Sequence, residues 1–228
     1  FLARTIWLSL DPYYRNVMKN SQLYAERLQP GDVMVGETVA QVVESKHADF
    51  RAGEYVAVRS GWQQYSVSSG AGVRRLDPAV APLSTALGVL GMPGLTAHVG
   101  MSDIGQPKKG ETVVVSAASG AVGAVAGQIA KLAGSRVVGV AGGAEKGRFV
   151  TGTLGFDACI DHRADDLAAA LDRACPDGID VYWENVGGAL QAAVFPRLND
   201  FGRMVMCGMI AQYNDPNPPP GPNLGPVV

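Results

Sequence analysis

The segment Ala117-Ala-Ser-Gly-Ala-Val-Gly123 contains glycines whose spacing suits the binding of a phosphate group. Its pattern is A-x-x-G-x-x-G, a variant of the dinucleotide fingerprint with alanine at the first position. Gly120 would let the backbone approach a pyrophosphate, and Gly123 would let a helix pack closely on a sheet. The N–H groups at the start of that helix would face the anion. The segment therefore predicts a dinucleotide site formed by Ala117, Ser119, Gly120, Ala121, Val122 and Gly123.

The flanking segments supply the context that this pattern requires. Thr112–Ser116 is a continuous apolar run, typical of a strand buried on both faces of a parallel sheet. Apolar residues then recur at helical spacing from Val122 to Ala133. A strand, a glycine turn and a helix in this order favour dinucleotide binding. Two alternatives stay open: glycines that only allow tight packing, and a methyltransferase-type nucleotide site.

The end of the next expected strand bears on the choice between NAD and NADP. An NAD site usually has Asp or Glu about 20 residues beyond the glycines, bound to the ribose 2′-hydroxyl. Here the run 136–140 leads into Ala141-Gly142-Gly143 without an acid. Lys146 and Arg148 follow and could meet a 2′-phosphate, with Glu145 beside Lys146. We predict NADP(H), with Gly142 and Lys146 in its site. The alternative for Lys146 is a solvated lysine in the first turn of a helix.

The spacing of apolar residues divides the chain into two parts. Residues 1–81 show short alternating apolar segments, 37–44, 54–59 and 62–67, separated by Gly and Pro, which indicates a β-rich unit. Further on, strand-like runs alternate with helical segments, of which 165–174 is a second expected helix, and this alternation predicts a doubly wound α/β sheet. These runs begin near Thr112, Arg136, Phe156, Ile179 and Arg203. We expect an incomplete β-rich substrate domain (1–81), a dinucleotide-binding domain (82–215) and a Pro-rich tail (216–228).

Composition narrows the class of protein. The 228 residues are 47% hydrophobic, and 19 Lys and Arg against 21 Asp and Glu give a formal charge of -2. No basic field points to nucleic acid or a membrane surface, and no apolar stretch reaches the roughly 20 residues of a membrane span. Three widely spaced cysteines fit a reducing compartment. We expect a soluble cytoplasmic protein and, since the chain lacks an initiator Met and closes on a proline-rich segment, a fragment lacking both ends.

Seven segments, spread over nearly the whole chain, match one known family in its order. They are Leu8–Arg15, Leu83–Ala97, Val115–Gly123, Ala141–Lys146, Leu154–Asp157, Asp180–Gly188 and Cys207–Asn214. The chain resembles the zinc-independent medium-chain dehydrogenase/reductases, in the branch of prostaglandin reductases, curcumin reductases and alkenal double-bond reductases. The resemblance implies a GroES-like β domain, a Rossmann domain with about five of its six strands present, and a homodimer when complete. It also implies NADPH-dependent reduction of an α,β-unsaturated ketone or aldehyde.

The resemblance assigns roles to individual positions. It places Lys146 at the 2′-phosphate, Asn185, Val186 and Gly187 near the nicotinamide, Tyr213 toward the reacting carbonyl and Tyr13 in the substrate pocket. His162 stands where relatives often have a tyrosine close to the cofactor phosphate. Cys207 and Gly208 complete the cofactor residues that we expect, and Tyr65 is added to the substrate pocket.

The chemistry needs a hydride donor and a polarised carbonyl. Hydride would reach the β-carbon of the enone, and Tyr213 would donate a hydrogen bond to the developing enolate oxygen; losing such a donor typically costs about 3–4 kcal/mol. The alternative for Tyr213 is a loop tyrosine packed on the tail, and for Tyr65 a cross-strand packing residue. Tyr13 and Tyr14 are adjacent, so on an extended segment they would face opposite ways.

Metal ligands distinguish a zinc alcohol dehydrogenase from the function proposed by the resemblance. A zinc alcohol dehydrogenase would need a Cys or His ligand set in the β domain, but no cysteine precedes Cys159. The position of its Gly-His-Glu motif reads Val35-Gly36-Glu37, and His47 and His98 are isolated. We therefore expect no metal. A quinone oxidoreductase and a non-catalytic NADPH-binding protein remain as alternatives.

Overall fold

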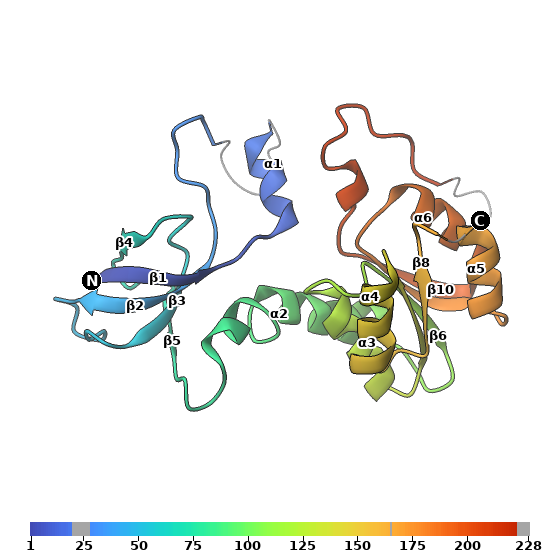
Figure 1. Cartoon of the computed structure of the whole chain (residues 1–228), viewed down its shortest axis with the longest axis horizontal. Coiled ribbons are helices and arrows are strands. Elements are labelled where there is room, and N and C mark those ends of the chain that lie inside the picture. Colours follow the sequence, from blue (N-terminus) through green and yellow to red (C-terminus); the bar gives the residue numbers. More distant parts are fainter. Residues whose placement is uncertain (20–27, 165, 223–228) are drawn as a thin grey trace. The chain divides into compact units, whose positions relative to one another are not determined.

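The computed structural model describes residues 1–19, 28–164 and 166–222, and the chain divides into two compact units, Phe1–Met92 and Pro93–Val228 (Figure 1). Asp165 of the predicted helix 165–174 and residues 223–228 of the expected tail lie outside the described residues. None of the helices in the described part of the chain combines the length and apolar character that crossing a membrane requires.

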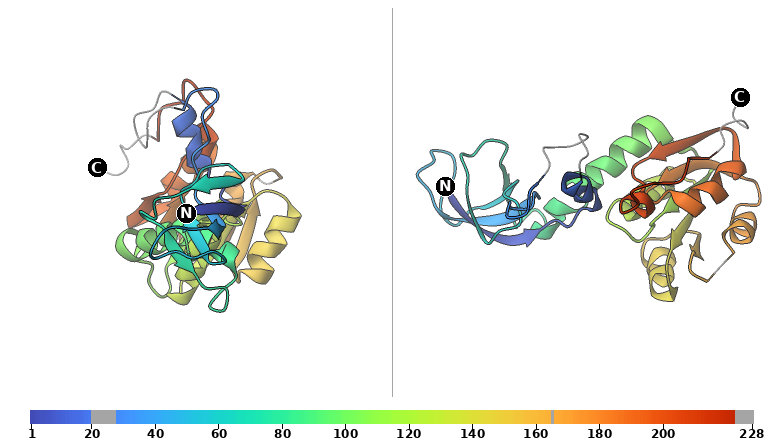
Figure 2. Two further views of the ribbon diagram at one scale, coloured as in Figure 1. Left: turned by 90° about the vertical axis from the view of Figure 1, so that its left-hand side faces the viewer. Right: turned by 90° about the horizontal axis from the view of Figure 1, so that it is seen from above.

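The first unit is built on one five-stranded antiparallel sheet, with its strands side by side in blue to cyan in Figure 2. Its strand order is β4-β1-β2-β3-β5. The bounds are β1 Leu2–Leu8, β2 Thr38–Glu44, β3 Tyr55–Val58, β4 Tyr65–Val67 and β5 Arg74–Leu76. Sequence patterns indicated β2, β3 and β4, whereas β1 and β5 gave no alternating signal, because most of their side chains are exposed or half-buried.

Short helical turns complete this unit: η1 (Pro12–Tyr14), α1 (Arg15–Met18) and η2 (Leu83–Leu87), the last of which packs on β2 and β3. The expectation of an extended segment at Tyr13 and Tyr14 is wrong. Pro12 opens a 3-10 turn there, as its fixed φ favours at a first helical position. The two tyrosine rings consequently contact each other, with centroids 4.5 Å apart.

The second unit contains the predicted doubly wound parallel sheet, with order β10-β9-β6-β7-β8. Its strands are β6 (Thr112–Ser116), β7 (Arg136–Ala141), β8 (Ala158–Asp161), β9 (Ile179–Glu184) and β10 (Leu198–Met206). The main helices are α2 (Met92–Val99), α3 (Gly123–Leu132), α4 (Ala144–Arg148), α5 (Leu167–Ala174) and α6 (Gly188–Val194). Shorter helical segments are η3 (Gly100–Gly105), η4 (Phe149–Thr153), η5 (Phe195–Arg197) and η6 (Ile210–Gln212).

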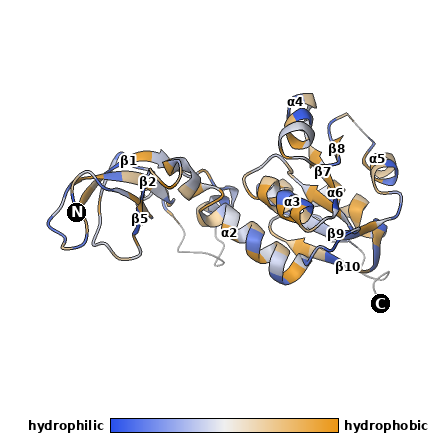
Figure 3. Ribbon diagram, turned by 90° about the horizontal axis from the view of Figure 1, so that it is seen from below, coloured by the Kyte–Doolittle hydropathy of each residue, from blue (hydrophilic) through white to orange (hydrophobic). Residues whose placement is uncertain are grey.

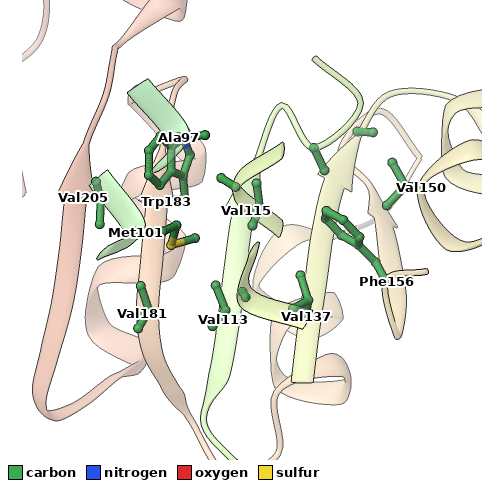
Figure 4. Close-up of a cluster of buried hydrophobic side chains, with 14 residues drawn as sticks. Ala97, Met101, Val113, Val115, Val137, Val150, Phe156, Val181, Trp183 and Val205 are labelled. Carbon is green, nitrogen blue, oxygen red and sulfur yellow. The ribbon is translucent and has the colours of Figure 1, made fainter. Parts of the chain in front are cut away.

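Helices cover both faces of this sheet. On one face, Ala126 and Ala130 of α3 belong to one buried cluster with side chains of β6, β7 and β9. Figure 4 shows this cluster, with Met101 of η3 beside Val113 and Val181. On the other face, α5 and α6 bury Leu171 and Leu190 against the alternate residues of the same strands. Both faces are therefore apolar, and Figure 3 shows hydrophobic ribbon along β7.

The strand order reverses between β6 and β9. From β6 the chain proceeds outward to β7 and β8, and it then returns to the other side of β6 as β9 and β10. Open α/β sheets bind ligands outside the carboxyl ends of their strands at such a reversal. The ends of β6 and β9 are therefore the place where this fold positions a ligand.

Candidate dinucleotide-binding site

The turn between β6 and α3 is closed by its own backbone. Ala117 has a left-handed backbone, with φ 48°, and its carbonyl oxygen accepts a hydrogen bond from the Gly120 N–H at 2.9 Å. A Cβ atom on Gly123 would lie 2.5 Å from that same oxygen, and one on Gly120 would lie 3.1 Å from it. Position 123 therefore has no room for a side chain unless the turn backbone moves, whereas a Cβ atom at position 120 would be crowded and would need a shift of only a few tenths of an ångström.

The start of α3 offers N–H groups to an anion. Val122, the residue that precedes the helix, has no side-chain oxygen to cap it, and the structure shows no side-chain cap bond there. The N–H groups of Ala124 and Ala126 already donate to the carbonyl oxygens of Gly120 and Val122, both at 2.9 Å, so the donors that face an anion belong to the residues before Ala124, and the helix dipole adds positive potential at this end. The predicted residues Ser119, Ala121 and Val122 thus lie beside donors suited to a pyrophosphate.

The side chains of Arg163 and His162 lie over the end of β7. A Cβ atom on Gly142 would lie 2.7 Å from Arg163 Nε and 2.8 Å from His162 Nε2, so both side chains extend over this glycine. Asp161 accepts hydrogen bonds from the backbone N–H groups of Gly143 (2.9 Å) and Arg163 (3.0 Å). These two bonds hold the pKa of the Asp161 carboxyl below its usual range, with the charges of His162 and Arg163 adding to them.

Lys146 lies on α4, directly after this turn, with its side chain exposed. Arg163 was missed by the sequence reasoning. Its only signal is its place next to His162, at the end of a strand that leads to the same sheet edge. The described geometry brings Gly142 and His162 together, and their role at a cofactor phosphate stays a prediction.

Hydrogen bonds join the ends of β6 and β9. The backbone N–H of Asn185 donates to Ser116 Oγ at 2.6 Å, and its side-chain amide donates to the Ser116 carbonyl oxygen at 2.7 Å. The Trp183 indole N–H donates to Asn185 Oδ1 at 3.1 Å. Asn185 is therefore held immediately beside the strand end from which the glycine turn begins.

Glu184, the last residue of β9, is fully buried and was not predicted as a site residue. Its Oε1 accepts hydrogen bonds from the backbone N–H groups of Val186 (2.7 Å) and Gly187 (2.9 Å) and lies 3.2 Å from Ser116 Oγ. Its Oε2 is buried with no hydrogen-bond partner among the described residues. The carboxylate thus closes the 185–187 turn from inside the protein.

The segment after β10 is attached to this turn. The N–H groups of Cys207 and Gly208 donate to the Glu184 carbonyl oxygen, at 2.9 and 3.0 Å. Ile210 and Ala211 donate in the same way to Asn185 and Val186, at 3.1 and 3.0 Å. Burial raises the pKa of the half-buried Cys207 thiol, so this cysteine is a packing residue at neutral pH.

Tyr213 follows η6 and is half-buried. A Cβ atom on Gly208 would lie 2.8 Å from the Tyr213 hydroxyl oxygen and 3.5 Å from the Asn185 carbonyl oxygen. Gly208 therefore makes room for the hydroxyl beside the 185–187 turn. The structure brings Tyr213, Gly208 and this turn together at the carboxyl edge of the sheet.

The two predicted pocket residues of the first unit are Tyr13 and Tyr65. Tyr13 is half-buried against Tyr14, whose hydroxyl accepts a hydrogen bond from the Glu37 N–H at 3.3 Å. Burial, together with Tyr13, raises the pKa of Tyr14. Tyr65 is 52% exposed on the edge strand β4, opposite Arg4 of β1. Their place in a substrate pocket stays a prediction.

In the Val35-Gly36-Glu37 segment, Gly36 occupies the position of the histidine in the Gly-His-Glu motif of zinc enzymes. A Cβ atom on Gly36 would lie 2.8 Å from Trp62 Nε1 and 3.6 Å from the Tyr14 hydroxyl oxygen. The Trp62 indole thus covers the space that a side chain at position 36 would need. No group of three or more His, Cys, Asp or Glu side chains suited to a metal ion occurs in the parts of the chain that the structure describes.

A doubly wound sheet with a tight glycine turn at its strand reversal, preceded by an antiparallel β unit, defines a dehydrogenase-type dinucleotide-binding protein. Residues 1–76 match the family model "N-terminal domain of oxidoreductase", and residues 121–223 match "Zinc-binding dehydrogenase". Among curated proteins, the NADPH-dependent curcumin reductase of Escherichia coli (strain K12) is 54% identical over 227 residues, covering 100% of this chain and 66% of that protein. Prostaglandin reductase 1 of Rattus norvegicus is 48% identical, covering 97% and 67%.

A solved structure, CurA of Vibrio vulnificus in complex with NADPH, superposes with a TM-score of 0.92 at 51% identity, covering 99% of this chain and 67% of that one. The chain therefore belongs to the medium-chain dehydrogenase/reductase family, in the branch that contains the curcumin, prostaglandin and alkenal reductases. It spans about two thirds of the length of these relatives.

Proposed function

We propose that the protein reduces the carbon–carbon double bond of α,β-unsaturated ketones or aldehydes with NADPH. The observation that carries this proposal is the glycine turn at the reversal between β6 and β9, with Tyr213 attached to the same edge. The names of relatives agree with it, including a 2-alkenal reductase (NADP(+)-dependent) of Nicotiana tabacum that is 44% identical.

The residues present fit NADPH. A Cβ atom on Gly123 would clash with the Ala117 carbonyl oxygen, and one on Gly120 would crowd it, so the turn stays tight, and the uncapped start of α3 would hold the pyrophosphate. Lys146, with His162 and Arg163 over Gly142, would hold the 2′-phosphate. When bound, NADPH supplies the hydride for the β-carbon of the substrate, and the protein orients the reacting atoms.

Tyr213 would donate a hydrogen bond to the substrate carbonyl oxygen, where negative charge develops as the hydride reaches the β-carbon. Such a donor stabilises the transition state more than the ground state. We expect Tyr213→Phe to lower kcat for an enone by about 10²–10³-fold, the range for one lost oxyanion donor. NADPH affinity, measured by fluorescence titration, should stay within a factor of about two. Unchanged turnover would exclude Tyr213 as the donor.

The cationic side chains around Gly142 are expected to determine the choice of cofactor. Lys146→Ala removes a charge that would interact with the 2′-phosphate of NADPH, a group that NADH lacks. The ratio of kcat/KM for NADPH to kcat/KM for NADH should therefore fall by roughly tenfold or more. This magnitude follows from the free energy of a charge-assisted hydrogen bond, about 1.5–3 kcal/mol. Lys108→Ala is the matched control, because Lys108 is exposed and lies before the amino end of β6, at the opposite edge of the sheet. An unchanged ratio in the Lys146 variant would refute the phosphate assignment.

The direct experiment follows NADPH absorbance when the protein meets a small aliphatic enone, with NADH in parallel and identification of the product. A saturated ketone and slow use of NADH support the proposal. Consumption of NADPH with a quinone but not with an enone would favour a quinone oxidoreductase. Binding of NADPH without consumption would favour a non-catalytic binder.

A further inference from the structure

The end of β9 carries an ionisable group in a place where its charge is costly. Glu184 is fully buried, and no cationic side chain pairs with it by a salt bridge among the described residues. Burying a carboxylate without a counter-ion is unfavourable unless hydrogen bonds compensate it. An apolar side chain would fill a strand end of this kind at lower cost, so packing alone does not explain a glutamate here.

Two hydrogen bonds of Glu184 are directed at the 185–187 turn. Its Oε1 accepts from the N–H groups of Val186 and Gly187, at 2.7 and 2.9 Å. Gly187 has φ 75°, a left-handed conformation, and Gly188 after it has φ 61°. A turn of this shape leaves its N–H groups pointing inward, and Glu184 is the acceptor that satisfies them.

The same carboxylate also lies at the end of β6. Ser116 Oγ is 3.2 Å from Glu184 Oε1 and accepts the N–H of Asn185 at 2.6 Å. Ser116 directly precedes Ala117, the first residue of the glycine turn. Glu184 therefore connects the strand end that leads into the phosphate turn with the 185–187 turn, across the reversal at which this fold binds ligands.

The 185–187 turn in turn holds the segment that carries Tyr213. The N–H groups of Ile210 and Ala211 donate to the carbonyl oxygens of Asn185 and Val186. A displacement of the turn would therefore move η6 and Tyr213 relative to the glycine turn. Misplacing reacting groups by about 1 Å can cost on the order of 10²-fold in rate.

We propose that Glu184 is a positioning residue for hydride transfer: its buried carboxylate fixes the 185–187 turn and thereby aligns the Tyr213 segment with the cofactor turn. This inference rests on the proposed function. Glu184 does not touch the reacting atoms; it acts through Val186, Gly187 and Ser116.

Two substitutions separate the acceptor role from the volume of the side chain. Glu184→Gln keeps an oxygen that can accept from Val186 and Gly187, whereas Glu184→Met keeps a similar unbranched shape without a strong acceptor. At saturating NADPH we expect the Met variant to lower kcat by about 10–100-fold with KM for the enone within about threefold, because alignment and not binding is lost. The Gln variant should stay within about fivefold of the unmodified protein.

Ile179→Val is the matched control, since Ile179 is buried at the opposite end of the same strand. It should lower the thermal midpoint slightly and leave kcat unchanged. If the Met variant does not fold, Ser116→Ala, which removes the hydroxyl that accepts the Asn185 N–H, should produce the same loss of kcat. The proposal is overturned if the Met or Ala variant keeps kcat within twofold, or if Gln and Met lower kcat equally.

Amide hydrogen exchange gives a readout that needs no substrate. The Val186 and Gly187 amides should exchange at least tenfold faster in the Met variant than in the Gln variant, while Val114 and Val115 of β6 keep their protection. Equal exchange at Val186 and Gly187 would overturn the proposal. An unmodified protein that fails to reduce enones would refute the proposed function, whereas the exchange comparison would still decide whether Glu184 holds the turn.

Discussion

Gly123→Ala tests the glycine turn by adding one methyl group at its tightest point. The added Cβ would lie 2.5 Å from the Ala117 carbonyl oxygen, 3.1 Å from its carbonyl carbon and 3.2 Å from Ala118 Cα. All three neighbours are backbone atoms, so no side chain can rotate away. Ordinary contact begins at 3.4 Å, so the methyl group and the oxygen must separate by about 0.9 Å (3.4 minus 2.5).

That separation has opposing effects on stability. Overpacking typically costs about 1–3 kcal/mol, while alanine gains about 1 kcal/mol over glycine inside a helix. The free energy of unfolding should therefore fall by no more than about 2 kcal/mol. NADPH binding has no such compensation, because the Ala117 carbonyl that must move is the acceptor that closes the turn onto Gly120. We expect Kd for NADPH to rise at least tenfold, about 1.4 kcal/mol.

The assay is fluorescence titration with NADPH, paired with urea unfolding in the absence of cofactor. Gly152→Ala is the matched control, because a Cβ atom there meets no atom within 4 Å, and its Kd should be unchanged. A Kd for Gly123→Ala within twofold of the unmodified protein, at similar stability, would refute the assignment of this turn to the pyrophosphate.

Two further predictions concern the dependence of stability on pH. Burial raises the pKa of the Cys175 thiol from 9.0 to about 11. The folded state therefore holds the thiol proton more tightly than the unfolded state does. The resulting contribution to the free energy of unfolding, up to about 3 kcal/mol, is present below pH 9 and is lost as the pH rises to 11. Urea unfolding across this range should show the decline, and Cys175→Ala should show less of it. Burial by itself would raise the pKa of Glu111, but the bonds from Arg203 at 2.6 and 3.0 Å, the bond from the Lys108 N–H and the charge of Arg203 together outweigh burial and hold the pKa of Glu111 below 4.5. Glu111→Gln should cost about 1.5–3 kcal/mol at pH 7, a deficit that shrinks as pH falls below 4.5; a deficit independent of pH would contradict the role of the charge.

The parts of the site that follow from local pattern could be predicted from the sequence. The continuous apolar run Thr112–Ser116 predicts a strand buried on both faces, and all five of its residues are buried. The glycine spacing after it predicts the turn and the start of α3. The predicted helix 165–174 is observed as α5, with Asp166 as its N-cap accepting from the N–H groups of Ala168 and Ala169. In each case the signal lies within about ten consecutive residues.

The residues that sequence reasoning missed depend on contacts between distant segments. A glutamate that ends an apolar run is usually solvated, and only the pairing of β6 with β9 shows that Glu184 is buried beside Ser116. Arg163 likewise becomes a candidate site residue only through its proximity to Gly142, which follows a different strand. The extended segment expected at Tyr13 was wrong because Pro12 begins a helical turn.

The bonds between Ser116 and Asn185 have a consequence for the order in which the protein folds. They join residues 69 positions apart. Closing such a long loop costs conformational entropy, which the contacts of β7 and β8 within the loop must offset. The glycine turn, by contrast, is closed by bonds between residues three positions apart, such as Ala117 and Gly120. We therefore expect the local bonds of the glycine turn to form earlier in folding than the Ser116–Asn185 bonds, so that alignment of the Tyr213 segment with the turn comes late.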